Sequence, residues 1–318
     1  MAGDESKSEG VPEWIGNTPF PSDQKKTTII TENMVVPFLY GFEGNQVENQ
    51  VFVSTDRILM AEWILSPGAH YEPPGLHLYG DECYYIVEGN AIAFNPETGE
   101  TYKLFAGDAL LIPQKTRHQI FNFDTKIVKA IACVAPRIWA EDKMGTFIPE
   151  VERPKFYTSD FFSQEKSEIP ERTAILAKTC PSIDSLGKWP APGPQLRHNK
   201  QLVQITPKEH LPLIHGKKQH VLMDFIVSND YMHLALLTIP VGGYSELEAH
   251  KGDEAGAVLE GNLAVRIPSK KENRKNATYD HYHIEQGRKF FIPEGVRHQY
   301  INFTDNPIKT YIATAPEL

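Results

Sequence analysis

The feature that most constrains this chain of 318 residues is an internal repeat. Short motifs of the first half recur in the second half in the same order and at similar intervals. We therefore expect the two halves to build the same fold, and a chain of this length has room for about two domains, each with its own core. The matching segments are 37–41 with 212–216, 53–54 with 227–228, 107–113 with 287–293, and 135–136 with 315–316.

The residue pattern within each half is that of β-strands. Segments rich in Val, Ile, Phe and Tyr alternate with clusters of Gly, Pro, Asn and Asp over residues 28–136, and again over residues 202–318. Many short strands separated by turn residues are typical of an all-β sandwich or barrel. We therefore predict one all-β domain in each of these two ranges.

The two remaining segments break this rhythm. Residues 1–27 are polar and interrupted by prolines, which predicts a mobile or loosely docked tail. Residues 137–201 are charged and contain several prolines, which predicts an irregular linker with a short helix that begins near Ser159, a good capping residue. A connection of that length is uncommon unless it packs or functions. The residues that could tether the tail to a core are Trp14, Ile15 and Phe20.

Potential metal ligands stand at matching positions in the two halves. Side chains alternate between the faces of a strand, so Glu82, Tyr84 and Ile86 point one way and Cys83 points the other. One histidine precedes this carboxylate and another follows it in the sequence. Two histidines and one carboxylate, with coordination positions left open, form the facial arrangement of non-haem iron oxygenases. The two sets are His77, Glu82 and His118, and His250, Glu254 and His298.

These residues follow the two motifs of the cupin family, G-x5-H-x-H-x3,4-E-x6-G and G-x5-P-x-G-x2-H-x3-N, and because both motifs occur twice the chain resembles a bicupin. The resemblance implies an all-β fold of two cupin barrels (double-stranded β-helix, or jelly-roll, barrels) joined by the irregular linker. It also implies up to four ligand positions in each barrel. The second copy fills all four, with Glu248 in place of the first histidine, whereas Gly75 stands at that position in the first copy.

The same resemblance implies a divalent metal ion as the cofactor. Two carboxylates, Glu248 and Glu254, would make the second site harder and more anionic, which favours Fe or Mn, with Zn or Ni as alternatives. The opposing interpretation is that the ligand positions are remnants in barrels that no longer bind metal. A Glu-x-His opening is also similar to that of the bicupin ureidoglycine aminohydrolases, which use manganese, although their later ligands differ from Glu254 and His298.

Alignment of the two copies predicts different cavities. When the ligand glutamates are aligned, Tyr84 stands opposite Gly256, so we expect more room beside the second carboxylate. Tyr300 lies two residues beyond the last histidine of the second copy, and its hydroxyl needs a partner if it is buried. We take Tyr84, Tyr300 and Glu248 as candidate catalytic residues.

Two further positions distinguish the copies. His233 aligns with Met60, and it either faces the second site or is a core histidine bonded to the backbone. Lys115 stands where the second copy has Gly295, which predicts a positive φ or a different turn in the first copy.

Three classes of function remain open at this stage, since the fold alone does not determine function. The first is a metal-dependent dioxygenase acting on a small oxygen-rich molecule, which we favour because such chemistry is common among proteins that resemble bicupins. The second is a redox-neutral metalloenzyme: a sugar isomerase, a lyase or a hydrolase. The third is a non-catalytic bicupin that binds a small molecule.

Composition narrows the partners. The 32 basic and 41 acidic residues give a net charge of −9, and no long basic run offers a nucleic-acid footprint. We also find no apolar run long enough to cross a bilayer and no apolar core of a signal peptide at the start, so we expect a cytoplasmic protein. Three cysteines are too few for a disulfide framework, and we expect Cys83 and Cys133 to be buried thiols. We also predict a homodimer, the commonest closed assembly.

Overall fold

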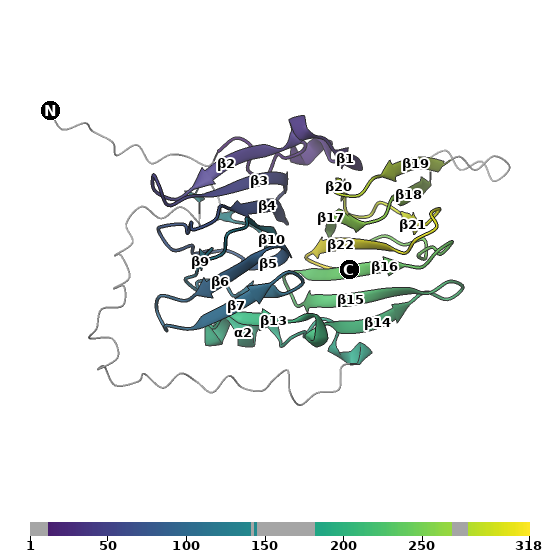
Figure 1. Ribbon diagram of the computed structural model, residues 1–318. Coiled ribbons are helices and arrows are strands. Elements are labelled where there is room, and N and C mark those ends of the chain that lie inside the picture. The colour runs from purple at the N-terminus through teal and green to yellow at the C-terminus, as the bar shows by residue number, and fades with distance from the viewer. Residues whose placement is uncertain (1–11, 141–142, 145–181, 269–278) are drawn as a thin grey trace, which may run out of the picture.

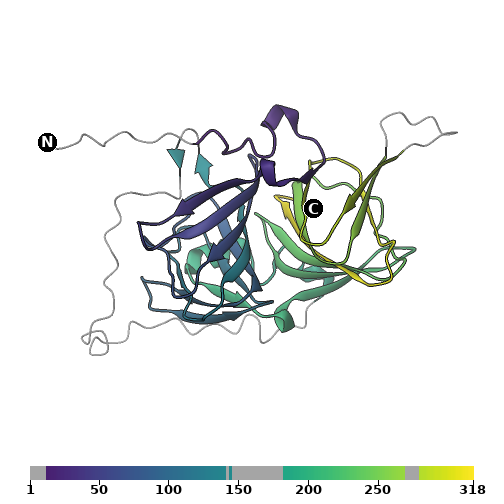
Figure 2. The ribbon, with the colours of Figure 1, turned by 45° about the horizontal axis from the view of Figure 1, so that its top comes forward.

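The computed structural model describes residues 12–140, 143–144, 182–268 and 279–318. It confirms the predicted all-β class: two antiparallel β-barrels lie side by side, one built mainly from each repeat (Figure 1). The turned view in Figure 2 separates the two barrels, the first in purple to teal and the second in green to yellow.

The first barrel closes a seven-stranded sheet against a three-stranded one. The order of the larger sheet is β13-β8-β5-β10-β4-β3-β2, and that of the smaller is β7-β6-β9. Strand β5 is buried on both faces over its first six residues, because one face lines the barrel and the other meets the second barrel. The strands of the first repeat are β2 (Val36–Tyr40), β3 (Val47–Ser54), β4 (Leu59–Leu65), β5 (Asp81–Glu88), β6 (Asn90–Phe94), β7 (Thr101–Phe105), β8 (Ala109–Ile112), β9 (Gln119–Phe121) and β10 (Val128–Ala135).

The second barrel repeats this topology strand for strand. Its larger sheet has the order β1-β20-β17-β22-β16-β15-β14, and its smaller sheet has the order β19-β18-β21. The strands of the second repeat are β14 (Leu211–His215), β15 (Val221–Ser228), β16 (His233–Ile239), β17 (Asp253–Glu260), β18 (Leu263–Pro268), β19 (Tyr279–Ile284), β20 (Lys289–Ile292), β21 (Gln299–Ile301) and β22 (Ile308–Ala315).

The two barrels exchange their first strands. Strand β1 (Thr28–Ile30) pairs with β20 of the second barrel, and the two lie close together in Figure 1. Strand β13 (Val203–Ile205) pairs with β8 of the first barrel. The sequence division into 28–136 and 202–318 therefore follows the repeat and not the sheets. Each exchanged strand covers an edge of the other barrel with backbone hydrogen bonds, so neither barrel has a complete sheet without the other repeat.

Two cations reinforce this exchange at equivalent places. Arg197 contacts Asp81 of the first barrel (Nη1 to Oδ2, 2.8 Å) and Asp230 of the second. Lys25 contacts Asp253 of the second barrel (Nζ to Oδ2, 2.9 Å) and Asp56 of the first (Nζ to Oδ1, 2.7 Å). Asp81 and Asp253 are fully buried and each immediately precedes a predicted ligand glutamate. The cations therefore neutralise buried charge beside both candidate sites.

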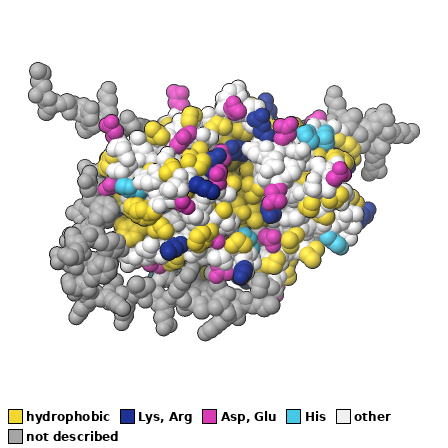
Figure 3. Space-filling view, viewed as in Figure 1, with side chains coloured by type: hydrophobic (Ala, Val, Ile, Leu, Met, Phe, Trp, Pro, Cys, Tyr) yellow, Lys and Arg dark blue, Asp and Glu magenta, His cyan; other side chains and the backbone are white. Residues whose placement is uncertain are grey.

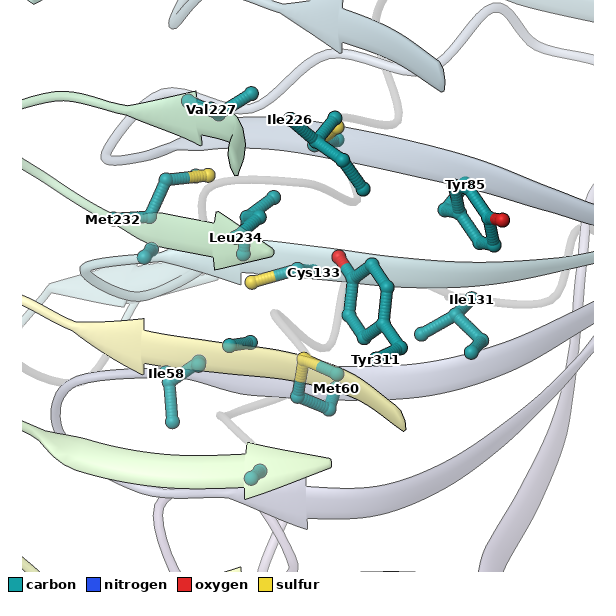
Figure 4. Close-up of a cluster of buried hydrophobic side chains, with 14 of the residues drawn as sticks. Ile58, Met60, Tyr85, Ile131, Cys133, Ile226, Val227, Met232, Leu234 and Tyr311 are labelled. Atoms are coloured by element: carbon teal, nitrogen blue, oxygen red, sulfur yellow. The ribbon is translucent and has the colours of Figure 1, made fainter. Parts of the chain in front are cut away.

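The interface between the barrels is an apolar core. Ile58, Met60 and Cys133 of the first barrel pack in one cluster with Leu234 and Tyr311 of the second (Figure 4). Both described cysteines are buried free thiols in this cluster, which confirms that Cys83 faces away from the ligand side of its strand.

The segments before the exchanged strands are ordered where they are described. Ile15, in the predicted tail, is buried, and Trp14 stacks on Phe38 with ring centroids 5.6 Å apart. The helix predicted near Ser159 lies outside the described residues. Among the described residues of 137–201 there is a seven-residue helix, α2. The remaining short elements are η1 (Ser22–Gln24), η2 (Glu32–Met34), β11 (Trp139–Ala140), β12 (Lys143–Met144), η4 (Ile183–Ser185), α2 (Gly193–Asn199) and η5 (Pro207–Glu209).

The surface carries charges of both signs. On the face seen in Figure 3, lysine and arginine side chains are scattered among acidic and apolar ones. Across the described residues we find no helix that combines the length and apolar character needed to cross a membrane.

Candidate metal centres

The first site brings together the three residues predicted from the sequence. His77 precedes β5, Glu82 is the second residue of β5, and His118 lies just before β9. The Oε2 atom of Glu82 is 2.8 Å from Nε2 of His77 and 3.0 Å from Nε2 of His118. All three side chains are buried, and their potential donor atoms lie within 4.8 Å of one another.

The second site has the same construction. Oε2 of Glu254 lies 3.1 Å from Nε2 of His250, and Oε1 of Glu254 lies 3.4 Å from Nε2 of His298. These donor atoms also lie within 4.8 Å of one another. Glu254 and His298 are buried and His250 is half-buried, so this site is the more accessible of the two.

The backbone orients one histidine of each site toward the carboxylate. Nδ1 of His298 lies 2.9 Å from the carbonyl oxygen of Val296, and Nδ1 of His118 lies 3.3 Å from that of Thr116. A carbonyl oxygen only accepts, so Nδ1 donates to it, and Nε2 is the ring nitrogen that faces the carboxylate. Nε2 of His298 is buried without a hydrogen-bond partner. A buried ring nitrogen of this kind fits a metal ligand, because a metal would satisfy it.

The carboxylates are held in their ionised form. Burial alone would raise the pKa of Glu82, but His77 and His118 hold that pKa well below its ordinary value. Burial would likewise raise the pKa of Glu254, but His298 and His250 hold that pKa well below its ordinary value. An ionised carboxylate with two imidazoles is a mixed N/O donor set that suits a divalent transition metal. Both groups therefore fit a metal ion.

Glu248, the predicted fourth ligand, lies outside the second group. Its Oε2 atom is 2.9 Å from Nε2 of His215, and its side chain is about one-third exposed (31%). Its backbone pairs with that of His298 through two hydrogen bonds, as Gly75 pairs with His118 in the first site. Glu248 thus helps to place His298 through the main chain. Its role as a ligand stays a prediction.

Comparison with known proteins agrees with this architecture. A family model for the cupin domain matches residues 61–134 and 235–313. The chain therefore contains a cupin domain in each repeat and is a bicupin. No curated protein sequence matches it.

Solved structures share the fold of this bicupin at low sequence identity. The putative glyoxylate-induced protein of Pseudomonas aeruginosa is 12% identical, with a TM-score of 0.58 and coverage of 98% of this chain and 97% of that one. Bacillus subtilis oxalate decarboxylase, studied for its Mn(II) centres, is 14% identical, with a TM-score of 0.54 and coverage of 93% and 79%. The 7S globulin of Momordica charantia is 12% identical, with a TM-score of 0.55 and coverage of 91% and 84%.

The two candidate catalytic tyrosines of the bicupin lie beside the ligand groups from different strands. Tyr84, on β5, has its hydroxyl 3.4 Å from Nε2 of His118. Tyr300, on β21, donates a hydrogen bond from its hydroxyl to Oε1 of Glu254. Burial raises the pKa of both hydroxyls well above the ordinary value, so both are protonated donors at neutral pH. Their catalytic roles stay predictions.

The cavities differ in size as predicted, but not for the predicted reason. The first measures about 70 Å³ and the second about 320 Å³. Gly256 does not open the second cavity, because a Cβ there would lie 2.4 Å from Cζ of Phe290. The first barrel pairs Tyr84 with Leu110 across the same two strands. The copies have exchanged a large and a small residue at this pair, which leaves the local volume filled in both.

The extra space comes from other positions. Trp63 is the fifth residue of β4, and Leu237 is the fifth of the equivalent strand β16. Tyr71 and Ser245 are also equivalent, because each carbonyl accepts a hydrogen bond from the Gln that follows the last ligand histidine of its site. Replacement of two large aromatic side chains by Leu and Ser accounts for the larger second cavity.

Two histidines beside the second cavity were not assigned to the site from sequence. His215, the last residue of β14, takes the place of Tyr40 at the end of β2. His233 pairs with Ser228 as Leu59 pairs with Ser54, so the predicted alignment with Met60 is wrong by one position. The β-bulge in the preceding strand lies at the same place in both repeats, so it does not change their alignment. Extending the matched segments 53–54 and 227–228 places His233 opposite Leu59, so a careful repeat alignment could have found both histidines.

Lys115 confirms the prediction of a strained turn. Its φ is +63°, and that of Gly295 at the equivalent position is +70°. A lysine in the left-handed region costs more than a glycine. The turn geometry is nevertheless the same, and His118 is positioned as His298 is.

Proposed function

We propose that this bicupin is a metal-dependent enzyme whose second barrel acts on a small molecule with adjacent oxygen atoms, with dioxygenase-type chemistry. One observation carries the proposal: two histidines and one glutamate converge beside a cavity of about 320 Å³. Three protein donors leave open positions on a divalent metal, and this number suits a chelating substrate together with O2.

The protein side chains have defined parts in this proposal. His250, Glu254 and His298 would hold the metal, which would supply Lewis acidity and oxygen activation. Tyr300 donates its hydroxyl proton toward Glu254, which fixes the orientation of that carboxylate. The apolar residues that line the cavity exclude water from the reacting atoms.

A second candidate is redox-neutral chemistry on a similar substrate. The hydrogen-bonded pair of Glu248 and His215 supports it, because the pair lines the second cavity and can take up and return a proton. Manganese would suit this chemistry, and an oxalate decarboxylase with Mn(II) centres is among the structural neighbours. The metal of this chain, Fe or Mn, is part of the proposal.

The experiment that tests the proposal is metal analysis of paired variants. In a His118→Ala background, which disables the first site, His298→Ala should remove the remaining metal. His283→Ala is the control, because His283 is an exposed residue of β19 outside both groups. Equal metal content in the two variants would refute the assignment.

Metal identity and oxygen uptake then separate the classes. Bound iron with oxygen consumption supports the dioxygenase. Manganese without oxygen uptake supports the redox-neutral enzyme, and a protein without metal is a binding module. The predicted homodimer belongs to the same proposal, and light scattering at micromolar concentration tests it.

A further inference from the structure

The second cavity joins the ligand group to the protein surface. Its lining includes Glu254, which is 2% exposed, and also Ile183 and Ile214, which are 66% and 77% exposed. One part of the cavity therefore lies at the buried carboxylate, and another part is bordered by apolar side chains in contact with solvent.

The polar side chains of the lining gather around the ligand group. Tyr300 and Thr314 both donate hydrogen bonds to Glu254, and Glu248 is hydrogen-bonded to His215, the last residue of β14. His233 is bound to Ser228, with Oγ and Nδ1 2.9 Å apart. These polar groups therefore form hydrogen bonds with other protein groups, most of them near the ligand group.

Apart from His215, His233 and Ser245, the rest of the wall is apolar. It is formed by strands β14, β15, β16 and β22 of the larger sheet and by the turn that contains η4. A hydroxyl or carboxylate placed against this wall would lose its hydrogen bonds to water without replacement, which is unfavourable. The apolar residues that carry this argument are Leu213, Val221, Met223, Phe225, Leu237 and Ile312.

We infer that the second barrel takes an amphipathic small molecule, with two adjacent oxygen atoms at the end that meets the ligand group and an apolar body along the β14–β16 wall. This inference rests on the proposed function and specifies its substrate class. An engineered cavity of about 150 Å³ holds benzene, so a cavity of about 320 Å³ accommodates a body of roughly ten non-hydrogen atoms. Sugars and short diacids, which are polar at both ends, do not match this wall.

The first barrel serves as an internal reference for this inference. Its ligand group is equivalent, but its cavity of about 70 Å³ leaves room for no such body. Trp63 occupies the volume that Leu237 leaves open.

The test uses hydroxamates, which chelate metals through two adjacent oxygen atoms. Acetohydroxamate and hexanohydroxamate share this head and differ only in apolar length. A hexano-length hydroxamate that ends in a carboxylate is the polar match. Each is titrated by calorimetry into the His118→Ala protein loaded with Mn²⁺, so that only the second site is read. Hexanohydroxamate should bind at least about tenfold more tightly than acetohydroxamate and than the carboxylate-ended analogue, because its methylene groups are buried.

Two variants locate the effect. Leu237→Trp introduces the residue of the first barrel and should abolish most of the tenfold preference while acetohydroxamate still binds. Val241→Trp adds the same side chain at an exposed position just after β16 and should retain the preference. A preference that survives Leu237→Trp would overturn the inference, since the cavity would not be its cause.

The possible failures are distinguishable. If Mn²⁺ itself does not bind to the His118→Ala protein, the proposed function fails, and the substrate class fails with it. If Mn²⁺ binds and the three hydroxamates bind with the same affinity as one another, the metal site stands and the apolar substrate class is wrong. Tighter binding of the carboxylate-ended compound would also overturn it, in favour of a substrate that is polar at both ends.

Discussion

The two barrels have the same frame and different interiors. Each contains two histidines and one glutamate at equivalent positions, and each lends its first strand to the other. Their cavities nevertheless differ more than fourfold in volume, about 70 Å³ against about 320 Å³. The ligand groups stay alike because they are tied to the backbone at strand ends. The cavities differ because two interior positions hold Trp63 and Tyr71 in the first barrel and the smaller Leu237 and Ser245 in the second.

The mouths of the barrels also differ, at equivalent segments. The backbone N–H of Gly16 donates to the hydroxyl of Ser54, and that of Gly187 donates to Ser228. The residue before each glycine packs at its barrel, Ile15 in the first and Leu186 in the second. In the first barrel the stacked ring of Trp14 adds further cover. The two glycine segments are therefore held by equivalent backbone hydrogen bonds, but larger side chains, including Trp14, pack over the first barrel than over the second.

The largest expected effect is the loss of metal binding when a ligand glutamate is replaced, and it should be equal in the two barrels. Glu254→Gln should weaken metal binding at the second site by about 100-fold or more, because partners that merely orient a ligand already contribute 10–100-fold. Glu82→Gln should do the same at the first site. The controls are Glu260→Gln and Glu88→Gln, exposed glutamates on the same two strands. Metal titration of the four variants checks this, and the comparison breaks if a control loses as much metal as its partner variant.

The next effect concerns the cations that bridge the barrels. Arg197→Ala should lower the free energy of unfolding by about 3–5 kcal/mol, because it leaves the buried carboxylate of Asp81 without its cationic partner. Lys25→Ala should cost less, about 2 kcal/mol, since a single ammonium makes weaker contacts than a guanidinium fork, which here also stacks on Tyr231 at 3.8 Å. Urea unfolding measures both, and equal losses would contradict the asymmetry.

The same variant has a predictable pH dependence. Burial raises the pKa of Asp81, and Arg197 opposes this shift. Without Arg197 the folded-state pKa of Asp81 rises further, so Arg197→Ala loses the most unfolding free energy at neutral pH, where the Asp81 carboxylate is ionised. The difference in unfolding free energy between the variant and the wild type should become smaller as the pH falls and this carboxyl group takes up a proton.

His233 should make the second barrel sensitive to acid. Burial lowers its pKa to about 4, despite the opposing influence of the Pro316 carbonyl and Glu317. Because the folded-state pKa lies below the unfolded value of about 6.5, full stability is present above pH 6.5 and is lost as the pH falls toward 4. The loss should approach about 3 kcal/mol at pH 4. His233→Leu, the residue of the first barrel, should remove this component from stability curves measured by urea unfolding, and an unchanged pH profile would disprove the assignment.

The smallest effect sharpens the comparison of volumes. Trp63→Leu in the tightly filled first barrel should cost about 2 kcal/mol, because it creates a cavity among packed neighbours. The reverse change, Leu237→Trp, should cost less than about 1 kcal/mol, because the side chain enters existing space instead of overpacking a core. Denaturation midpoints at constant m-value check this. A costly Leu237→Trp would mean that the second cavity is closed to a group of that size.

Much of the candidate site was readable from local pattern. Glu82 and Cys83 were placed on opposite faces because strand side chains alternate, and the structure confirms both. The two ligand groups followed from motif spacing, since turns and strand ends set where a side chain leaves the backbone. Tyr300 was expected to need a partner, and its partner is Glu254.

Pairings between distant segments were not readable in this way. Glu248 has the spacing of a ligand, but its contact with His215 depends on how the end of β14 meets the segment before β17 that carries Glu248 and His250. Gly256 was expected to open space, yet Phe290 of the neighbouring strand fills it. The exchange of β1 and β13 has no signature in those short segments, because their partners lie in the other repeat.

The sequence by itself determined that the chain folds as two alike β-barrels with a His-Glu-His group in each, because repetition, side-chain alternation and turn residues act over short distances along the chain. Only the tertiary structure decided which barrel has room for a substrate. That property depends on how Trp63, Tyr71, Leu237 and Ser245 meet residues far away in sequence. Volume in a packed interior is shared among neighbours from many strands, so it is fixed only when those strands come together.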